Sequence, residues 1–251
     1  MSPRSSQLSV TRAVASGHTT LVMDGVLDAT TYRTVRDAVV KAALDAPPLI
    51  LVDVTALWAP ASSAWSVFTS ARWLVVDWPD VPIGLVCSHV AGRRMLARNG
   101  ITRYLPVYAN LTAARNAMAD DVDPHRRRVR EVWPAVPSAV PSVRDFIAHW
   151  LHTWSLDEFA ATAGVVATVL VDNVLRHTDS DPDVRLETDG ATVTVAVTDG
   201  SPSPACVRDE DEILGCLSEL QIVHALTRVW GNTPTPEGKV VWAVMGPENR
   251  L

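Results

Sequence analysis

The helix-like stretch at residues 164–178, GVVATVLVDNVLRHT, carries a group of polar side chains near its end. They are Asp172, Asn173, Arg176 and His177. One turn before the asparagine, at position i−4, stands Val169. A valine can neither accept a proton nor bind a metal ion. Asp172 is a carboxylate next to Asn173 in the chain, but neighbouring helical residues point about 100° apart. Asp172 therefore cannot simply take the position that Val169 has on the face of Asn173.

Two adjacent hydroxyls, Ser62 and Ser63, stand near the start of another helix-like stretch, ASSAWSVFTSARWLVV. The preceding run, LILVDVT, is almost continuously apolar, which is typical of a strand buried on both faces. Serine is favoured at the first position of a helix, where its side chain accepts hydrogen bonds from backbone N–H groups. The simplest interpretation is that one of these serines caps the helix.

The composition is that of a globular protein with a sizeable core. The chain has 251 residues, of which 47% are hydrophobic and 20% charged, enough for one large or two ordinary domains. The net charge of −6 gives no indication of general nucleic-acid binding. The three cysteines are odd in number and widely spaced, which favours neither a disulfide framework nor a zinc site. They are Cys87, Cys206 and Cys216.

No targeting or membrane segment is indicated. The start of the chain, MSPRSSQLSVTR, lacks the apolar core of a signal peptide. The longest apolar run, residues 160–171, is interrupted by threonines and is shorter than a bilayer span. We therefore expect a cytoplasmic protein.

A proline-rich segment divides the sequence. Residues 120–141 contain four prolines, which block both helices and central strands, so we expect an interdomain linker there. The expected domains are residues 1–119 and 142–251. A basic run at residues 126–128 is either a docking patch or, as charge runs more often are, a solvated face.

The two halves predict different α/β arrangements. In the first half strand-like and helix-like segments alternate, which indicates a mixed sheet with helices packed on it. In the second half two helices precede a strand pair with Asp-Gly at the turn, a strong hairpin signal. A third helix over about residues 217–231 and a last strand, KVVWAVM, complete a two-layer α/β sandwich.

The first half resembles a STAS domain of the anti-sigma factor antagonist kind, over about residues 18–118. The segments that carry the resemblance are LVMDGVLDATTYRTVRDAV, LILVDVTALWAPASSAWSVF and GITRYLPVYANLTAA. The Gly-x-Leu-Asp sequence at residues 25–28 and the Gly100-Ile101 pair are in register with the family.

The resemblance implies a phosphorylation site at Ser62, with Ser63 beside it. In the family, a loop reading Asp-Ser-Ser-Gly or Asp-Ser-Thr-Gly carries the hydroxyl that a cognate kinase phosphorylates. Here Ala61 replaces the aspartate and Ala64 the glycine. A phosphate at a helix N-terminus meets free N–H groups and the positive end of the helix dipole.

The second half, about residues 142–245, resembles a histidine-kinase-like ATPase domain, with the anti-sigma factor serine kinases as the nearest branch. The segments are VRDFIAHWLHTWSLDEFAATAGVVATVLVDNVLRHT, VAVTDGSPSPA and HALTRVWGNTPTPEGKVVWAVM. The resemblance implies Mg²⁺ coordination by Asn173 and an adenine-binding carboxylate at Asp199, followed by Gly200. It also implies a catalytic glutamate at the position that Val169 occupies.

The family's glycine-rich lid is also altered. Aligned on Ile222-Val223, its glycine positions fall on Leu217 and Glu219, while Gly215 lies nearby but out of register. A glutamate facing phosphates is repulsive. We therefore expect a degenerate, inactive kinase fold, with ATP or ADP and Mg²⁺ held, if at all, through Asn173, Asp199, Gly200 and Gly215.

Together the two resemblances predict a non-enzymatic partner-switching regulator of an alternative sigma factor. Its expected partners are an anti-sigma factor kinase or a STAS antagonist protein, or the two domains of this chain binding each other. Direct contact with nucleic acid or a membrane is not expected. The alternatives are a weak ATP-dependent serine kinase and a nucleotide-binding sensor.

Overall fold

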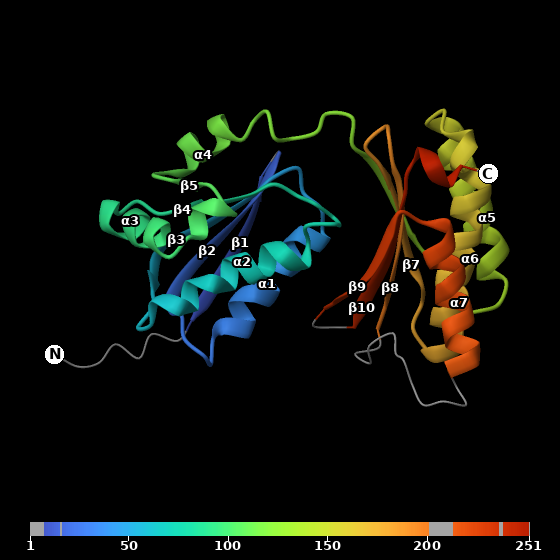
Figure 1. Ribbon diagram of the computed structural model, residues 1–251, viewed down its shortest axis with the longest axis horizontal. Helices are drawn as coiled ribbons and strands as arrows, with labels where there is room; N and C mark the ends of the chain where they lie inside the picture. Colours follow the sequence, from blue (N-terminus) through green and yellow to red (C-terminus); the bar gives the residue numbers. More distant parts are fainter. Residues whose placement is uncertain (1–7, 16, 201–212, 236–237, 251) are drawn as a thin grey trace. The chain divides into compact units, whose positions relative to one another are not determined.

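In the computed structural model the chain divides into two compact units, Met1–Asp123 and Pro124–Leu251. The structure describes residues 8–15, 17–200, 213–235 and 238–250; of residues 213–219 it describes the backbone alone. Each unit contains one five-stranded sheet with its own helices (Figure 1).

The first unit is built on a mixed sheet with the strand order β1-β2-β3-β4-β5. Strand β1 runs antiparallel to β2, and every other neighbouring pair is parallel. Parallel neighbours require crossover connections, which the helices supply. The strands are β1 Ser9–Ala15, β2 His18–Val26, β3 Ile50–Trp58, β4 Ile83–Val86 and β5 Val107–Tyr108.

The helices of the first unit pack on this sheet. Helices α1 and α2 contact each other, and α4 packs over β3, β4 and β5. A small core under α4 joins Leu51 and Val86 to Ala114 and Met118. The helices are α1 Tyr32–Leu44, η1 Ser62–Trp65, α2 Ser66–Leu74, α3 Val90–Arg98, η2 Ile101–Arg103 and α4 Leu111–Ala117.

The second unit is a two-layer α/β sandwich, as its sequence order predicts. Its sheet is antiparallel throughout, with the order β6-β7-β8-β10-β9, and α5, α6 and α7 cover one face (Figure 1). The strands are β6 Arg127–Val132, β7 Asp183–Thr188, β8 Val193–Asp199, β9 Val229–Pro234 and β10 Lys239–Met245. The helices are α5 Ala139–Thr153, η3 Asp157–Phe159, α6 Ala160–His177, α7 Ile213–Leu226 and η4 Pro247–Asn249.

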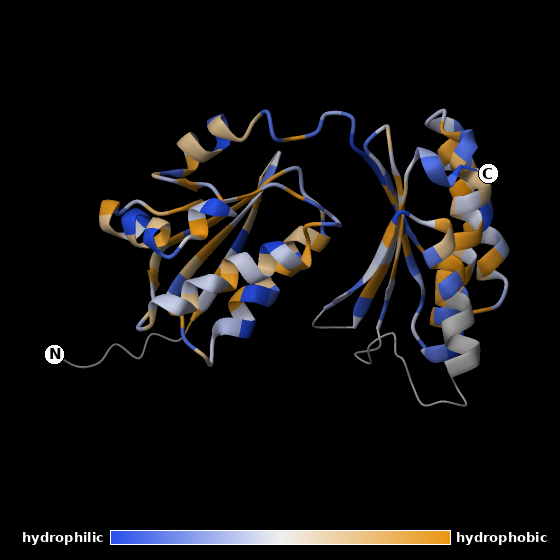
Figure 2. Cartoon of the chain, viewed as in Figure 1, coloured by the Kyte–Doolittle hydropathy of each residue, from blue (hydrophilic) through white to orange (hydrophobic). Residues whose placement is uncertain are grey.

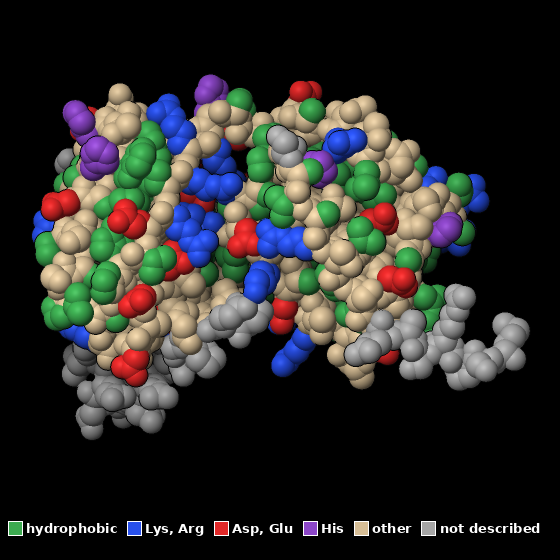
Figure 3. All heavy atoms as spheres, turned by 180° about the vertical axis from the view of Figure 1, so that it is seen from behind, with side chains coloured by type: hydrophobic (Ala, Val, Ile, Leu, Met, Phe, Trp, Pro, Cys, Tyr) green, Lys and Arg blue, Asp and Glu red, His purple; other side chains and the backbone are tan. Residues whose placement is uncertain are grey.

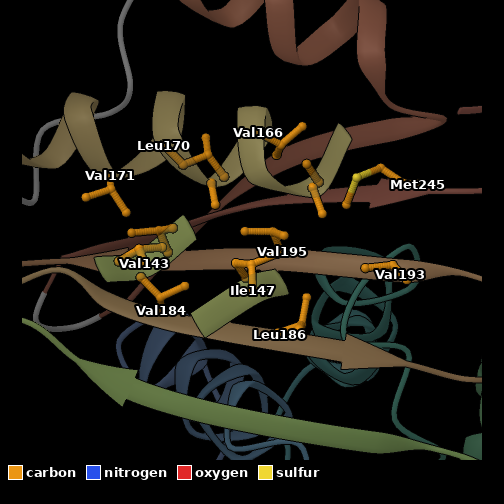
Figure 4. Packing of buried hydrophobic residues seen from close by; sticks show 14 of the residues in the cluster. Val143, Ile147, Val166, Leu170, Val171, Val184, Leu186, Val193, Val195 and Met245 are labelled. Atoms are coloured by element: carbon orange, nitrogen blue, oxygen red, sulfur yellow. The ribbon is translucent and has the colours of Figure 1, made fainter. Parts of the chain in front are cut away.

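The core of the second unit lies between its helices and its sheet. Apolar side chains from both layers point toward one another there (Figure 4), and in the strands hydrophobic residues are interspersed with hydrophilic ones (Figure 2). Alternate residues of β8 and β10 supply the sheet side, because successive strand residues face opposite sides. The labelled members are Val143, Ile147, Val166, Leu170, Val171, Val184, Leu186, Val193, Val195 and Met245.

The predicted Asp-Gly hairpin joins β7 to β8. Gly190 adopts the left-handed conformation, with φ of +91°. The Asp189 carboxylate accepts hydrogen bonds from the backbone N–H groups of Ala191 (2.8 Å) and Thr192 (2.6 Å). Partial burial acts to raise the pKa of Asp189, but these hydrogen bonds outweigh it and lower the pKa from its ordinary value.

The structure corrects two expectations about the elements. The segment expected as a linker contributes β6, an edge strand paired with β7, and the start of α5. An edge strand tolerates flanking prolines, since one side of its backbone needs no partner in the sheet. The third helix ends at Leu226, not Gly231, because residues 229–234 pair with β10.

Helix α6 with the preceding turn, Asp157–His177, is long and apolar enough to cross a membrane by length and composition. The expectation that this apolar segment is too short was therefore wrong on length, because the helix continues past Val171 through a more polar last turn. Half of its most apolar window is buried inside the fold, against the sheet. We assign it to the core of the second unit.

Two glycines of the second unit give opposite predictions. A Cβ on Gly238 would lie 2.0 Å from the Asp199 carbonyl oxygen, whereas a Cβ on Gly164 of α6 would have no atom within 4 Å. We expect Gly238→Ala to destabilise the unit by about 1–3 kcal/mol, because backbone must move. Gly164→Ala should stabilise it by about 0.5–1 kcal/mol, because alanine favours a helix.

Hydrogen exchange of α6 peptides, followed by mass spectrometry in the full chain, measures both changes. Faster exchange in Gly238→Ala and slower exchange in Gly164→Ala are expected. Equal effects of the two substitutions would contradict the close packing of Gly238.

Candidate functional site

The first candidate site is the loop between β3 and α2, which carries both predicted serines. Ser62 and Ser63 open the short helix η1, which continues directly into α2, and both are exposed. The capping position is Ala61, in extended conformation, and no side chain caps η1 or α2. The interpretation that either serine caps the helix is therefore wrong: the serines lie inside the first turn.

A buried aromatic side chain holds this turn in place. Trp65, the last residue of η1, is buried and stacks on Phe68 of α2, with ring centroids 6.1 Å apart. The Tyr32 hydroxyl of α1 lies 2.8 Å from Ser70 Oγ of α2 and joins the two helices. The serines thus stand on a fixed helix start, and no hydrogen bond joins either hydroxyl to the described residues.

The first turn suits an anionic group. The backbone N–H groups at the start of a helix have no partner within the helix, and the dipole is positive there. No acidic residue lies in the first turn of η1 or α2. A phosphate on Ser62 or Ser63 would therefore be stabilised locally while remaining on the surface.

The loop after β2 lies at the same edge of the sheet. Val26 pairs with Trp58 at the ends of two parallel strands, and the Leu27 N–H donates to the Trp58 carbonyl at 2.8 Å. Hydrogen bonds from the Thr30 side chain and backbone lower the pKa of Asp28 from its ordinary value. Asp28 therefore supplies a fixed negative charge at this edge, and the Trp58 side chain is 62% exposed there.

The second candidate site is the C-terminal half of α6. Asn173 is 9% exposed and lies among the buried polar residues of the second unit. Val169, one turn earlier, is partly buried and packs against the hydrophobic core. Asp172 is drawn into an ion pair with Arg176, 2.7 Å away at the protein surface. No carboxylate on α6 therefore takes the place of the missing base beside Asn173.

Asp199 ends β8 in a buried ion pair that sequence reasoning missed. The Lys239 ammonium nitrogen lies 2.8 Å from Asp199 Oδ2, and the two side chains are 7% and 1% exposed. Lys239 begins β10, and the strand register sets it directly opposite Asp199. The sequence shows a lysine at the start of the last strand, but it does not show this register.

The loop after α6 binds the end of the same strand. The Gly200 N–H donates to Ser180 Oγ at 3.0 Å, and that hydroxyl lies 2.8 Å from Thr178 Oγ1. The Thr178 hydroxyl donates in turn to the Val174 carbonyl in the last turn of α6. These bonds bring the end of α6 that carries Asn173 to the end of β8 that carries Asp199.

The predicted lid is only partly described. Gly215 and the positions aligned with the lid glycines, Leu217 and Glu219, fall on α7, but their side chains lie outside the described residues. Residues 201–212 are likewise outside the described part. In the described part of the chain, no group of three or more His, Cys, Asp or Glu side chains is placed to hold a metal ion.

The basic run at residues 126–128 is partly paired. Arg126 donates to the buried carboxylate of Glu187 at 2.8 Å, and Arg130, which follows the run in β6, pairs with Asp183. Figure 3 shows Lys and Arg side chains beside Asp and Glu on the face drawn there. This pairing favours the structural interpretation of the run over a docking patch.

No model of a known protein family matches the chain, and no curated protein matches it. Among solved structures, it is similar to an anti-sigma factor antagonist from Mycobacterium paratuberculosis, with 19% identity and a TM-score of 0.41 over 45% of this chain and 96% of that one. It is also similar to RsbS of Moorella thermoacetica with a serine-to-glutamate substitution, with 15% identity and a TM-score of 0.38 over 44% of this chain and 95% of that one. The anti-sigma factor antagonist SpoIIAA in its unphosphorylated form matches with 14% identity and a TM-score of 0.36 over 45% of this chain and 97% of that one.

These similarities cover the N-terminal part of the chain, where the α/β unit with its mixed sheet lies. They leave the second unit outside the matched region.

Proposed function

We propose that the chain is a non-enzymatic regulator in a partner-switching pathway that controls an alternative sigma factor in the cytoplasm. The first unit acts as a STAS antagonist, with Ser62 or Ser63 as its phosphorylation site. The observation that carries the proposal is the exposed, uncapped first turn that presents both hydroxyls above the buried Trp65.

Phosphorylation at this turn would act by charge. A phosphoserine adds close to two negative charges, and the fixed carboxylate of Asp28 already lies at the same sheet edge. A partner that docks across the exposed Trp58 and the serines then meets a strongly negative surface in place of two neutral hydroxyls. The proposed partner is an anti-sigma factor of the histidine-kinase-like type, which also supplies the phosphate.

The second unit serves in this proposal as a binding module with a degenerate kinase fold. Three contacts support its inactivity: Val169 packs in the core, Asp172 pairs with Arg176, and Asp199 pairs with Lys239. These described residues do not fit Mg²⁺ and ATP in the way that the resemblance implies, since the Asp199 side chain is 1% exposed and paired with Lys239, and no carboxylate of α6 stands beside Asn173. A serine kinase and a nucleotide sensor are the alternatives that the tests distinguish.

Binding to the partner tests the role of the first unit. The full chain is titrated by biolayer interferometry with each purified histidine-kinase-like anti-sigma factor of the source organism. We expect one of them to bind, Ser62→Glu or Ser63→Glu to weaken that binding at least about tenfold, and the alanine variants to retain it.

Thr112→Glu is the matched control, because Thr112 is exposed in the first turn of another helix, α4. It adds the same charge at a helix start and should leave the affinity unchanged. Binding to none of these proteins, or equal weakening by Thr112→Glu, would contradict the proposal.

Phosphate transfer tests the absence of kinase activity. The full chain is incubated with Mg²⁺ and ATP labelled on the γ-phosphate, and the serines are analysed by mass spectrometry. We expect no incorporation, because among the described residues of α6 no carboxylate stands beside Asn173 to act as a general base. Incorporation that Asn173→Ala abolishes would identify the chain as a serine kinase and overturn the proposal.

A further inference from the structure

The ion pair between Asp199 and Lys239 is buried on the helix side of the second sheet. Asp199 shares its strand face with Val197, and Lys239 shares its own with Val241, both members of the core. A carboxylate or an ammonium group buried alone carries a large desolvation cost, which a close partner of opposite charge offsets. Each group therefore depends on the other at this position.

The surrounding backbone keeps the pair closed. Gly238 packs so tightly on the end of β8 that an added Cβ would lie 2.0 Å from the Asp199 carbonyl oxygen. On the other side, the Gly200 N–H is bonded to Ser180. These contacts hold the two strand ends together, and the Lys239 Nζ lies 2.8 Å from Asp199 Oδ2.

We infer that Lys239 is a built-in substitute for the amino group of an adenine base and closes the second unit to adenine nucleotides. The inference rests on the proposed degenerate kinase fold, in which Asp199 is the base-binding acceptor. A carboxylate in such a site accepts an N–H bond from its ligand, and the Lys239 ammonium group donates that bond from within the chain. The unit accordingly needs no nucleotide to satisfy its buried carboxylate.

The substitution Lys239→Thr tests this inference. Removing the ammonium group takes away the Lys239 charge that lies 2.8 Å from the buried Asp199 carboxylate, so the variant is expected to be less stable and to accept an external donor. ADP binding to the full chain is measured by calorimetry, and thermal unfolding is measured with ADP or with inosine diphosphate, which carries a carbonyl group in place of the adenine amino group.

The expected result is no heat and no thermal shift for the natural chain at millimolar ADP. Lys239→Thr should bind ADP at least about tenfold more tightly than the natural chain and be stabilised by it, but not by inosine diphosphate. The double variant Asp199→Leu/Lys239→Met replaces both charges with apolar groups and should show no response to ADP.

Arg228→Met is the matched control for loss of a cation. Arg228 holds the pKa of the exposed Glu248 carboxyl at about 2 through a surface pair, which lies outside the buried site. This variant should show no response to ADP. If Lys239→Thr does not fold by itself, its refolding in ADP and in inosine diphosphate is compared, and recovery in ADP alone supports the inference.

Two outcomes would overturn the inference. Tight ADP binding by the natural chain that Lys239→Thr weakens would show that the lysine serves the nucleotide. No selective ADP response in either the natural chain or the variant would show that Asp199 is not a base-binding group. Neither outcome changes the result of the partner titration, so the proposed role of the first unit is judged separately.

Discussion

The buried bond between Asp199 and Lys239 fixes the end of β8 to the start of β10 and so defines one end of the second unit. Around it, Gly238 allows the two strand ends to approach, and Ser180 attaches the loop that follows α6. The position of Asn173 relative to the sheet therefore depends on this end of the fold. In the proposed degenerate kinase fold this carboxylate would be the ligand acceptor, and here it is buried and paired within the chain.

The two units differ in how their polar groups are satisfied. In the first unit, Ser62 and Ser63 are exposed on a helix start whose backbone N–H groups have no side-chain cap. In the second unit, the polar group that would meet a ligand is buried and internally paired. This contrast fits the proposed regulator, in which a surface modification changes partner binding and the second unit serves as a folded binding module.

Much of the fold follows from local sequence signals. Alternating strands and helices predicted the first unit, and the Asp189-Gly190 turn predicted the β7–β8 hairpin. These signals act over a few residues, where turn conformation and hydrophobic period decide the structure. The spacing of Val169 and Asn173 was also readable, because the two residues lie one turn apart on a single helix.

The features that the sequence did not predict depend on pairing between strands far apart in the chain. The pairing of Lys239 with Asp199 depends on the register between strands far apart in the chain. Residues 127–132 form β6 by pairing with the edge of β7, although prolines flank them. Trp230, which the sequence placed in the third helix, lies in β9 and pairs with β10. Exposure of both serines inside the turn, with Ala61 at the capping position, likewise required the structure.

The NMR signal of the Lys239 ammonium group shows most directly whether the chain itself supplies the partner of the Asp199 carboxylate. This ¹⁵N–¹H signal is recorded on the full chain at neutral pH, assigned by its loss in Lys239→Thr, with and without saturating ADP. We expect a slowly exchanging ammonium signal that ADP leaves unchanged. A signal that exchanges rapidly with water, or one that moves when ADP is added, would contradict it.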